Sequence, residues 1–198
     1  LIAREGSIIS GNSSFSAKRV KEVYGIEAGV LWPCVDTGEF PEDSSFDPDN
    51  PYPGTGEYVV SIGRASHAKG TWETISMLSG TGLSLVHVGG GDEGPLKMLE
   101  SHAESLGVNV WFAPRLESPE LVSIMRSARA VVGMAHKESF GLTPIESFSV
   151  GTPALFVDEG GFRDTIIDGK NGRLLGRGDI EGWHSALEQA SDPSIREE

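Results

Sequence analysis

The chain has 198 residues, of which 38% are hydrophobic, and its 29 acidic and 16 basic side chains give a formal net charge of −13. That length is enough to bury a sizeable core in one α/β domain. A surface this acidic argues against nucleic acid as a partner, and no apolar run approaches the roughly 18 residues that indicate a membrane-spanning helix.

The N-terminal part contains few structural signals. Residues 7–42 hold a short strand, a helix around residues 16–24 and the extended stretch VLWPCVDTGEF, together too small to bury a core. The single cysteine, Cys34, excludes an intrachain disulfide or a cysteine-based metal site, and its apolar neighbours predict a part-buried, unreactive thiol. The following residues 43–57, DSSFDPDNPYPGTGE, are typical of a surface loop or linker.

From residue 58 onward, predicted strands and helices alternate. Short apolar runs rich in β-branched residues predict strands at 57–63, 83–89, 108–112, 128–133, 153–157 and 172–176. Helical patterns follow at 71–80, 95–107, 118–128, 143–151 and 178–190. We expect Ser118 to be an N-cap and Gly107 to end its helix. The alternation predicts an α/β fold: a Rossmann-like, three-layer α/β/α domain with a mainly parallel sheet, which binds ligands at the carboxyl ends of its strands.

The first predicted strand ends in the loop GRASHAKG. This loop brings Arg64 and Lys69 to the carboxyl end of a strand and the start of a helix. Two cations in that position favour an anion site, in which arginine grips a phosphate with two hydrogen bonds and lysine supplies a point charge. The alternative is a pair of solvated surface charges.

The second predicted strand leads into VHVGGGDEG, residues 86–94, which fits the pattern G-x-G-x-x-G. A dinucleotide-binding fold carries this pattern on its first strand–helix turn, not its second. Asp92 and Glu93 would also repel a pyrophosphate. We therefore favour a turn that borders a ligand, and an NAD-dependent oxidoreductase remains the alternative reading of these glycines.

The loop HKESFGLTPIE, residues 136–146, places Glu138 and Glu146 eight positions apart at the start of a predicted helix. The backbone amides of residues 140–143 could form a cradle for a phosphate or an oxyanion. Alternatively, Thr143 is the N-cap of a capping box in which Glu146 only satisfies a backbone donor. The spacing alone does not decide between these readings.

The five histidines differ in their prospects. His67 and His136 fall in the two loops expected to border the ligand, which makes them the better candidates for a functional contact. His87 is expected inside the sheet, and His102 and His184 in helices. No H-x-x-x-H pair and no acidic cluster predicts a bound metal.

These motifs in this order resemble the C-terminal, donor-binding domain of the retaining glycosyltransferases of family 4, which have the GT-B fold. The resemblance starts near IISGNSSFSAKRVKEVYG and continues to HKESFGLTPIESFSVGTPALFVDEGGFRDTIIDGKNGRLL, covering roughly residues 10–190. Each motif alone is weak, but G-R-x4-K-G, E-x7-E and GTP followed by GG form a specific combination. The resemblance implies that residues 1–42 end the first domain and its crossover, 43–57 form a linker, and 58–198 form the donor-binding domain.

The resemblance also implies roles for individual residues. Arg64 and Lys69 would hold the donor diphosphate and offset its charge as it leaves, and Glu138 would contact the transferred sugar. Glu146 would accept hydrogen bonds from the ribose hydroxyls. The other donor-binding residues that it implies are Gly63, Gly90, Gly91, Arg115, Ser139, Phe140, Gly141, Leu142 and Thr143.

The implied reaction transfers a glucosyl or mannosyl group from a UDP-sugar or a GDP-sugar to an acceptor hydroxyl. The resemblance implies neither a cofactor nor a metal for this reaction. The acceptor, a glycan or a lipid, would bind to the first domain, and we expect this chain alone to bind donor but to transfer little. Asp164 stands where the family commonly has Glu. We expect a cytoplasmic protein, or one at the membrane periphery at full length. Alternatives are a non-catalytic nucleotide-sugar-binding module and a nucleotide-sugar epimerase.

Overall fold

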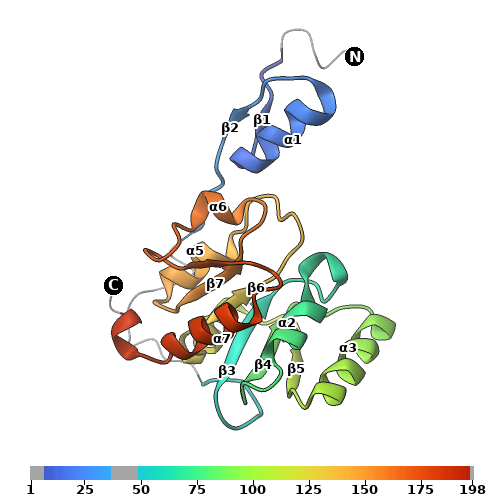
Figure 1. Cartoon of the computed structure of the whole chain (residues 1–198), viewed down its shortest axis with the longest axis vertical. Coiled ribbons are helices and arrows are strands. Elements are labelled where there is room, and N and C mark those ends of the chain that lie inside the picture. The colour runs from blue at the N-terminus through green and yellow to red at the C-terminus, as the bar shows by residue number, and fades with distance from the viewer. Residues whose placement is uncertain (1–6, 37–48, 197–198) are drawn as a thin grey trace.

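The computed structural model describes residues 7–36 and 49–196 (Figure 1). Six strands form one sheet in the order β5-β4-β3-β6-β7-β8, and every neighbouring pair is parallel. The strands are β3 (Tyr58–Ile62), β4 (Ser84–Val88), β5 (Val110–Ala113), β6 (Val131–Gly133), β7 (Ala154–Val157) and β8 (Arg173–Leu175). This order is that of a doubly wound, Rossmann-type sheet, so the predicted fold class is confirmed.

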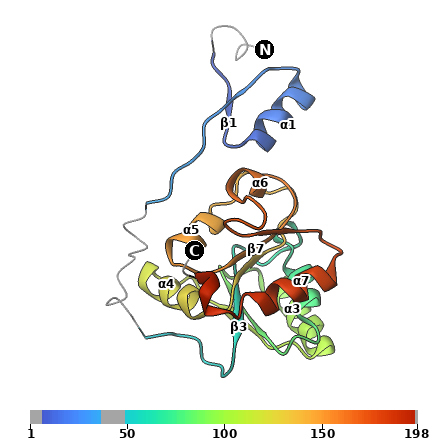
Figure 2. The same cartoon turned by 60° about the vertical axis from the view of Figure 1, so that its left-hand side comes forward.

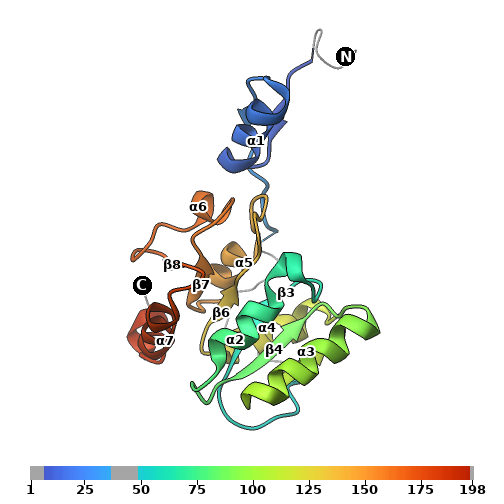
Figure 3. The ribbon, with the colours of Figure 1, turned by 45° about the vertical axis from the view of Figure 1, so that its right-hand side comes forward.

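Helices cover both faces of the sheet. α2, α3 and α7 lie on one face, and α4 and α5 lie on the other (Figures 2 and 3). The helical elements of this domain are η3 (His67–Lys69), α2 (Thr71–Leu78), α3 (Glu93–Leu106), α4 (Ser118–Ser127), α5 (Thr143–Ser149), α6 (Phe162–Thr165), α7 (Ile180–Gln189) and η4 (Pro193–Arg196). No helix in the described ranges is long and apolar enough to cross a lipid bilayer.

The sequence patterns explain these elements. Helices cover both faces of the sheet, so all of β4 and all of β3 except its last residue are buried. This burial explains why these strands are continuous apolar runs and do not alternate between apolar and polar residues. Gly107 adopts a left-handed φ of 67° and ends α3 as predicted. The N-cap of α4 is Glu117, so the prediction of Ser118 is wrong by one residue. The Glu117 amide donates to the Glu120 side chain at 3.0 Å, as in a capping box.

Residues 7–36 form a separate small unit beside α6 (Figure 1). Its parallel strands β1 (Ser10–Gly11) and β2 (Gly29–Val30) flank α1 (Ser14–Tyr24). No hydrophobic side chain of this unit is fully buried, in agreement with the expectation that it cannot form a core. The proposed boundary between domains stays a prediction, because residues 37–48 lie outside the described part of the chain.

The expectation that Cys34 is part-buried is wrong. Cys34 is exposed, because the extended stretch that carries it has no regular element of its own and packs on the domain core through its neighbour Val35. The prediction rested only on the apolar residues next to Cys34 in the sequence. As an exposed thiol, Cys34 is open to oxidation.

Candidate functional site

A cavity of about 440 Å³ opens at the carboxyl ends of four strands. Ser61, His87, Gly133 and Phe156, from β3, β4, β6 and β7, lie at its floor. The chain winds outward in one direction from β3 and in the other from β6, so the cavity sits where ligands bind in open α/β sheets. Its volume lies within the range of about 300–1,000 Å³ typical of small-molecule sites.

The structure brings most of the predicted site residues together at this cavity and leaves four of them outside it. Those that line it come from the segment between β3 and α2 and from the segment between β6 and the first turns of α5: Gly63, Lys69, Glu138, Ser139, Phe140, Gly141, Leu142, Thr143 and Glu146. Those that do not line it are Arg64, Gly90, Gly91 and Arg115.

The two loops meet in an ion pair at the cavity wall. The Nζ atom of Lys69 lies 2.5 Å from Oε2 of Glu138, and the two side chains are 39% and 19% exposed. The pair joins a cation from the β3 loop to a carboxylate from the β6 loop, residues that sequence analysis assigned separately to phosphate and sugar. Both groups therefore lie within reach of one ligand.

Arg64, the second predicted cation, points to a different partner. One of its terminal nitrogens lies 2.7 Å from each carboxylate oxygen of Asp92, in a pair that is largely exposed. From the sequence, Asp92 was expected to repel a pyrophosphate. In the structure it pairs with this arginine and neutralises its charge. Arg115 is exposed in the loop after β5.

Two of the three glycines of the G-x-G-x-x-G pattern, Gly89 and Gly91, lie close to the loop after β3, whereas a side chain at Gly94 would meet nothing within 4 Å. Gly89 has a φ of +128°, and a side chain there would overlap the backbone of Gly63. The carbonyl of Gly90 accepts a hydrogen bond from Ala65 at 2.7 Å. The turn therefore fits closely against the loop after β3, which accounts for Gly89 and Gly91 without a dinucleotide.

A second glycine pair supports the loop that carries Glu138. The amide of Gly161 donates to the carbonyl of Glu138 at 2.8 Å. Side chains at Gly160 or Gly161 would overlap the backbone of residues 138–140. The GG motif thus holds this loop at backbone contact distance.

The start of α5 differs from the predicted capping box. Leu142, with αR dihedral angles, is the N-cap, and no side chain caps the helix, so Thr143 is not the N-cap. The carbonyl of Leu142 accepts from the amide of Glu146 at 3.0 Å. Within the described residues, the amides of residues 140–143 donate no hydrogen bond to the protein. Four unpaired donors and the Glu146 side chain therefore border the cavity.

A buried histidine lies at the cavity floor. The register of β3 and β4 sets Ser61 beside His87, and the Ser61 hydroxyl lies 2.6 Å from Nδ1 of the ring. Burial lowers the pKa of His87 to about 4, so the ring is neutral near pH 7. Its Nε2 atom has no hydrogen-bond partner among the described residues.

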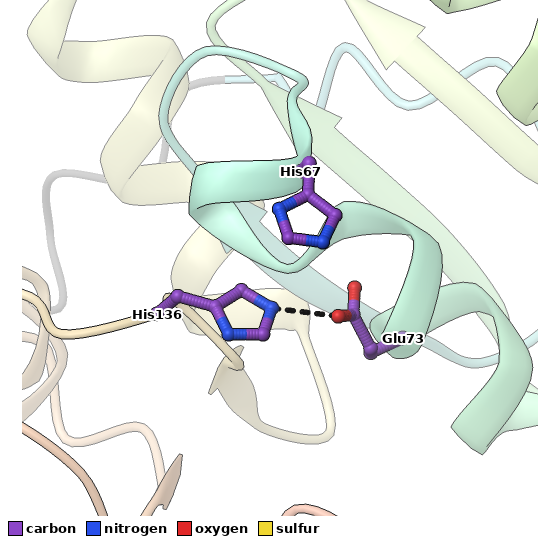
Figure 4. Close-up of side chains that lie close together, drawn as sticks. All are labelled: His67, Glu73 and His136. Atoms are coloured by element: carbon purple, nitrogen blue, oxygen red, sulfur yellow. Dashed lines mark hydrogen bonds and ion pairs between the residues drawn. The ribbon is translucent and has the colours of Figure 1, made fainter.

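Figure 4 shows a cluster that sequence analysis missed, made of His67, Glu73 and His136. None of the three lines the cavity. The Nε2 atom of His136 lies 2.7 Å from Oε1 of Glu73, and the rings of His67 and His136 stack at 4.8 Å. Burial would raise the pKa of Glu73, but the hydrogen bond and charge of His136, with the charge of Arg177, hold it below its ordinary value. The two histidines stood out in the sequence by their loops, whereas Glu73 carried no signal.

Comparison with known proteins agrees with this geometry. Residues 43–197 match the family model of glycosyl transferases group 1. D-inositol 3-phosphate glycosyltransferase of Acidothermus cellulolyticus is 30% identical over 94% of the chain and 46% of its own length. Glycogen synthase of Mycobacterium tuberculosis is 25% identical over 97% of the chain and 47% of its own length. The chain thus spans about half the length of the curated relatives it matches.

Solved structures share the fold. Anabaena HepE in complex with UDP-glucose matches with a TM-score of 0.78 at 20% identity, over 98% of this chain and 56% of HepE. The C-terminal domain of a Francisella tularensis glycosyl transferase group 1 protein, LpcC, matches with a TM-score of 0.66 at 26% identity, over 82% of this chain and 91% of that one. Because the family model matches most of its length, the chain belongs to the glycosyl transferases of group 1.

Proposed function

We propose that this chain is the donor-binding part of a retaining, family 4 hexosyltransferase that moves glucose or mannose from UDP or GDP to an acceptor hydroxyl. The observation that carries the proposal is the gathering of Lys69, Glu138, Glu146 and four unpaired amides around one cavity at the switch point of the sheet. The acceptor, a glycan or a lipid, would bind to a further domain. Residues 58–198 are the donor domain on this proposal.

The diphosphate would bind between Lys69 and the amides of residues 140–143. Negative charge grows on the diphosphate as the bond to the sugar breaks, and fixed donors stabilise that charge more in the transition state than in the ground state. Arg64 would join from the rim, exchanging Asp92 for a phosphate oxygen. No bound metal is needed for this stabilisation.

The two carboxylates would bind hydroxyl groups. A phosphate that takes over Lys69 releases Glu138 from its ion pair, and Glu138 can then accept hydrogen bonds from the sugar. Glu146 suits the vicinal diol of a ribose, because one carboxylate accepts two O–H donors. Gly90, Gly91 and Arg115 lie outside the cavity on the side of β4 and β5, where the base would rest.

The relatives' names and ligands support a nucleotide-sugar donor. HepE binds UDP-glucose, and the two curated relatives are a glycosyltransferase and a glycogen synthase. A uridine donor is therefore our first choice, with guanosine as the alternative.

Thermal-shift titration with UDP, GDP, UDP-glucose, GDP-mannose and NAD tests this proposal. A ligand at about 100 times its dissociation constant should add roughly 2.7 kcal/mol to the free energy of unfolding. We expect one nucleoside diphosphate to stabilise the wild type but not Glu146→Ala, whereas Glu100→Ala, on the exposed surface of α3, keeps the effect. Stabilisation by NAD alone, or an equal effect in Glu146→Ala, would contradict the proposal.

A further inference from the structure

We propose that His67, Glu73 and His136 bind one divalent transition-metal ion, for which Zn²⁺ is the best fit. One ligand atom from each of the three side chains lies within 4.8 Å of the other two (Figure 4). They come from η3, from α2 and from the loop after β6. None of them lines the donor cavity, so this site is separate from the proposed donor site and does not depend on it.

The donor set selects the class of ion. Two imidazole nitrogens and one carboxylate oxygen form a common protein ligand set for Zn²⁺, which leaves a fourth position for water. Nitrogen ligands favour zinc, cobalt and nickel, whereas magnesium and calcium prefer oxygen ligands throughout.

The backbone under the cluster holds its two loops at a fixed spacing. The amide of His136 donates to the carbonyl of Ala68 at 2.8 Å. The amide of Gly70 donates to the carbonyl of His67 at 2.9 Å, and a side chain at Gly70 would overlap the Met134 carbonyl. Because the main chains are in contact, the ligand side chains converge without rearrangement of either loop.

One atom of the cluster lacks a partner that an ion would supply. Oε2 of Glu73 is buried and makes no hydrogen bond within the described residues. A buried carboxylate oxygen is normally paired, and an unpaired one calls for an explanation such as an ion or a water molecule.

A neighbouring arginine pairs more closely with another carboxylate than with Glu73. Arg177 lies 4.0 Å from Oε1 of Glu73, but its guanidinium pairs with Glu159 at 3.0 Å and donates to the carbonyls of Met134 and Ala135. Because Glu159 offsets this positive charge, the carboxylate of Glu73 stays available to a cation.

Binding requires two local adjustments. The hydrogen bond of 2.7 Å between Nε2 of His136 and Oε1 of Glu73 must open, and the His67 ring must turn. The rings of His67 and His136 are nearly parallel, at 3°, so both cannot point at one ion as they stand. His67 is exposed and can turn about its own side-chain bonds to bring a nitrogen within the Zn–N distance of about 2.0–2.1 Å.

The position of the site suggests what an ion would do. His67 lies two residues before Lys69, and His136 lies two residues before Glu138. An ion held by both histidines would fix the loops that bring this lysine and this glutamate together.

The test uses the chain without a polyhistidine tag, treated with a chelator and then titrated with ZnCl₂ while thermal unfolding and bound metal are measured. We expect one zinc ion per chain and a raised Tm. Changes to groups behind metal ligands typically weaken binding about 10–100-fold, so loss of a direct ligand in Glu73→Gln or His67→Ala should weaken it by more than about 100-fold. His102→Ala, which removes a histidine on α3, should bind zinc like the wild type.

Circular dichroism establishes whether each variant is folded, and His67→Ala alters an exposed side chain. Co²⁺ gives a second readout, since its visible absorption reports four or five ligands around the ion. The proposal is overturned if the folded wild type binds no zinc, if Glu73→Gln and His67→Ala bind it as the wild type does, or if His102→Ala also loses it.

Discussion

The donor cavity has two kinds of wall, and they are built differently. The loops after β3 and β6 are locked to each other and to the sheet through main-chain contacts, such as His136 to Ala68 and Gly161 to Glu138. Glycines at the points of contact leave no room for side chains. These main-chain contacts fix the position of the wall without a ligand, as electrostatic stabilisation of a reaction requires.

The other wall, contributed by Asn12 and Pro33, belongs to the unit of residues 7–36. That unit is attached by the buried Ser13 hydroxyl, which donates to the carbonyl of Ser139, by Val35 and by exposed polar groups. Oδ2 of Asp164 accepts from the amide of Ser14 at 2.7 Å and from the Trp32 indole at 2.9 Å. Such contacts contribute little to stability. The residues after β3 and β6 are thus held by main-chain contacts, whereas the facing wall is held to the domain through side-chain hydrogen bonds.

The largest expected effect comes from breaking the first wall at Gly70. Gly70→Ala would force a methyl group into the Met134 carbonyl at a φ of +67°, and we expect it to lower the free energy of unfolding by about 3 kcal/mol or more. Gly82→Ala is the control, because it has a φ of +74° with no atom within 4 Å, and should cost only about 1–2 kcal/mol. Equal losses in denaturant titrations would show that the loop contact is not tight.

Acid should lower the free energy of unfolding through protonation of His87, which lines the cavity. Its pKa is about 4 in the folded chain and 6.5 when unfolded, so the unfolded state binds the proton more readily. The stability that the neutral ring contributes is complete above pH 6.5 and falls by about 3 kcal/mol as the pH drops to 4. The glutamine in His87→Gln does not titrate. Between pH 6.5 and 4, the free energy of unfolding of this variant should therefore fall by about 3 kcal/mol less than that of the wild type. Parallel pH curves for the two proteins would contradict the assignment.

Lys69→Met separates binding from stability. The Lys69–Glu138 pair is partly exposed, so we expect the free energy of unfolding to change by less than about 1 kcal/mol. Nucleoside diphosphate binding should weaken about 10–100-fold, as expected when a hydrogen bond to a charged group is lost. Lys97→Met, whose pair with Glu93 lies on the exposed surface of α3, is the matched control for calorimetric titration. Unchanged affinity in Lys69→Met would remove this lysine from the donor site.

The smallest effect on stability is expected at the facing wall. Asp164→Ala removes both hydrogen bonds from Ser14 and Trp32, and should change the free energy of unfolding of the sheet domain by less than about 1 kcal/mol. Limited proteolysis within residues 7–36 should become faster, because the unit loses two of its hydrogen bonds to the sheet domain. Proteolysis at the wild-type rate would indicate that other contacts hold this wall.

Much of the fold could be predicted because buried parallel strands produce continuous apolar runs, as in β3 and β4. The cavity wall was predictable too, since parallel strands bring loops such as those of Lys69 and Glu138 to one edge of the sheet. Side-chain partners were not predictable. Arg64 and Asp92 are 28 residues apart, and Glu73 and His136 are 63 apart, so these pairs depend on strand order and loop shape.

The most direct test of the central claim is amide hydrogen exchange with and without UDP-glucose, followed by mass spectrometry. The amides of residues 140–143 have no partner in the described structure and should exchange quickly until a diphosphate accepts from them. The account predicts that UDP-glucose slows exchange in residues 138–146 and around Gly63. Protection confined to the second large hollow, at residues 151–155 and 169–173, with none at 138–146, would contradict it.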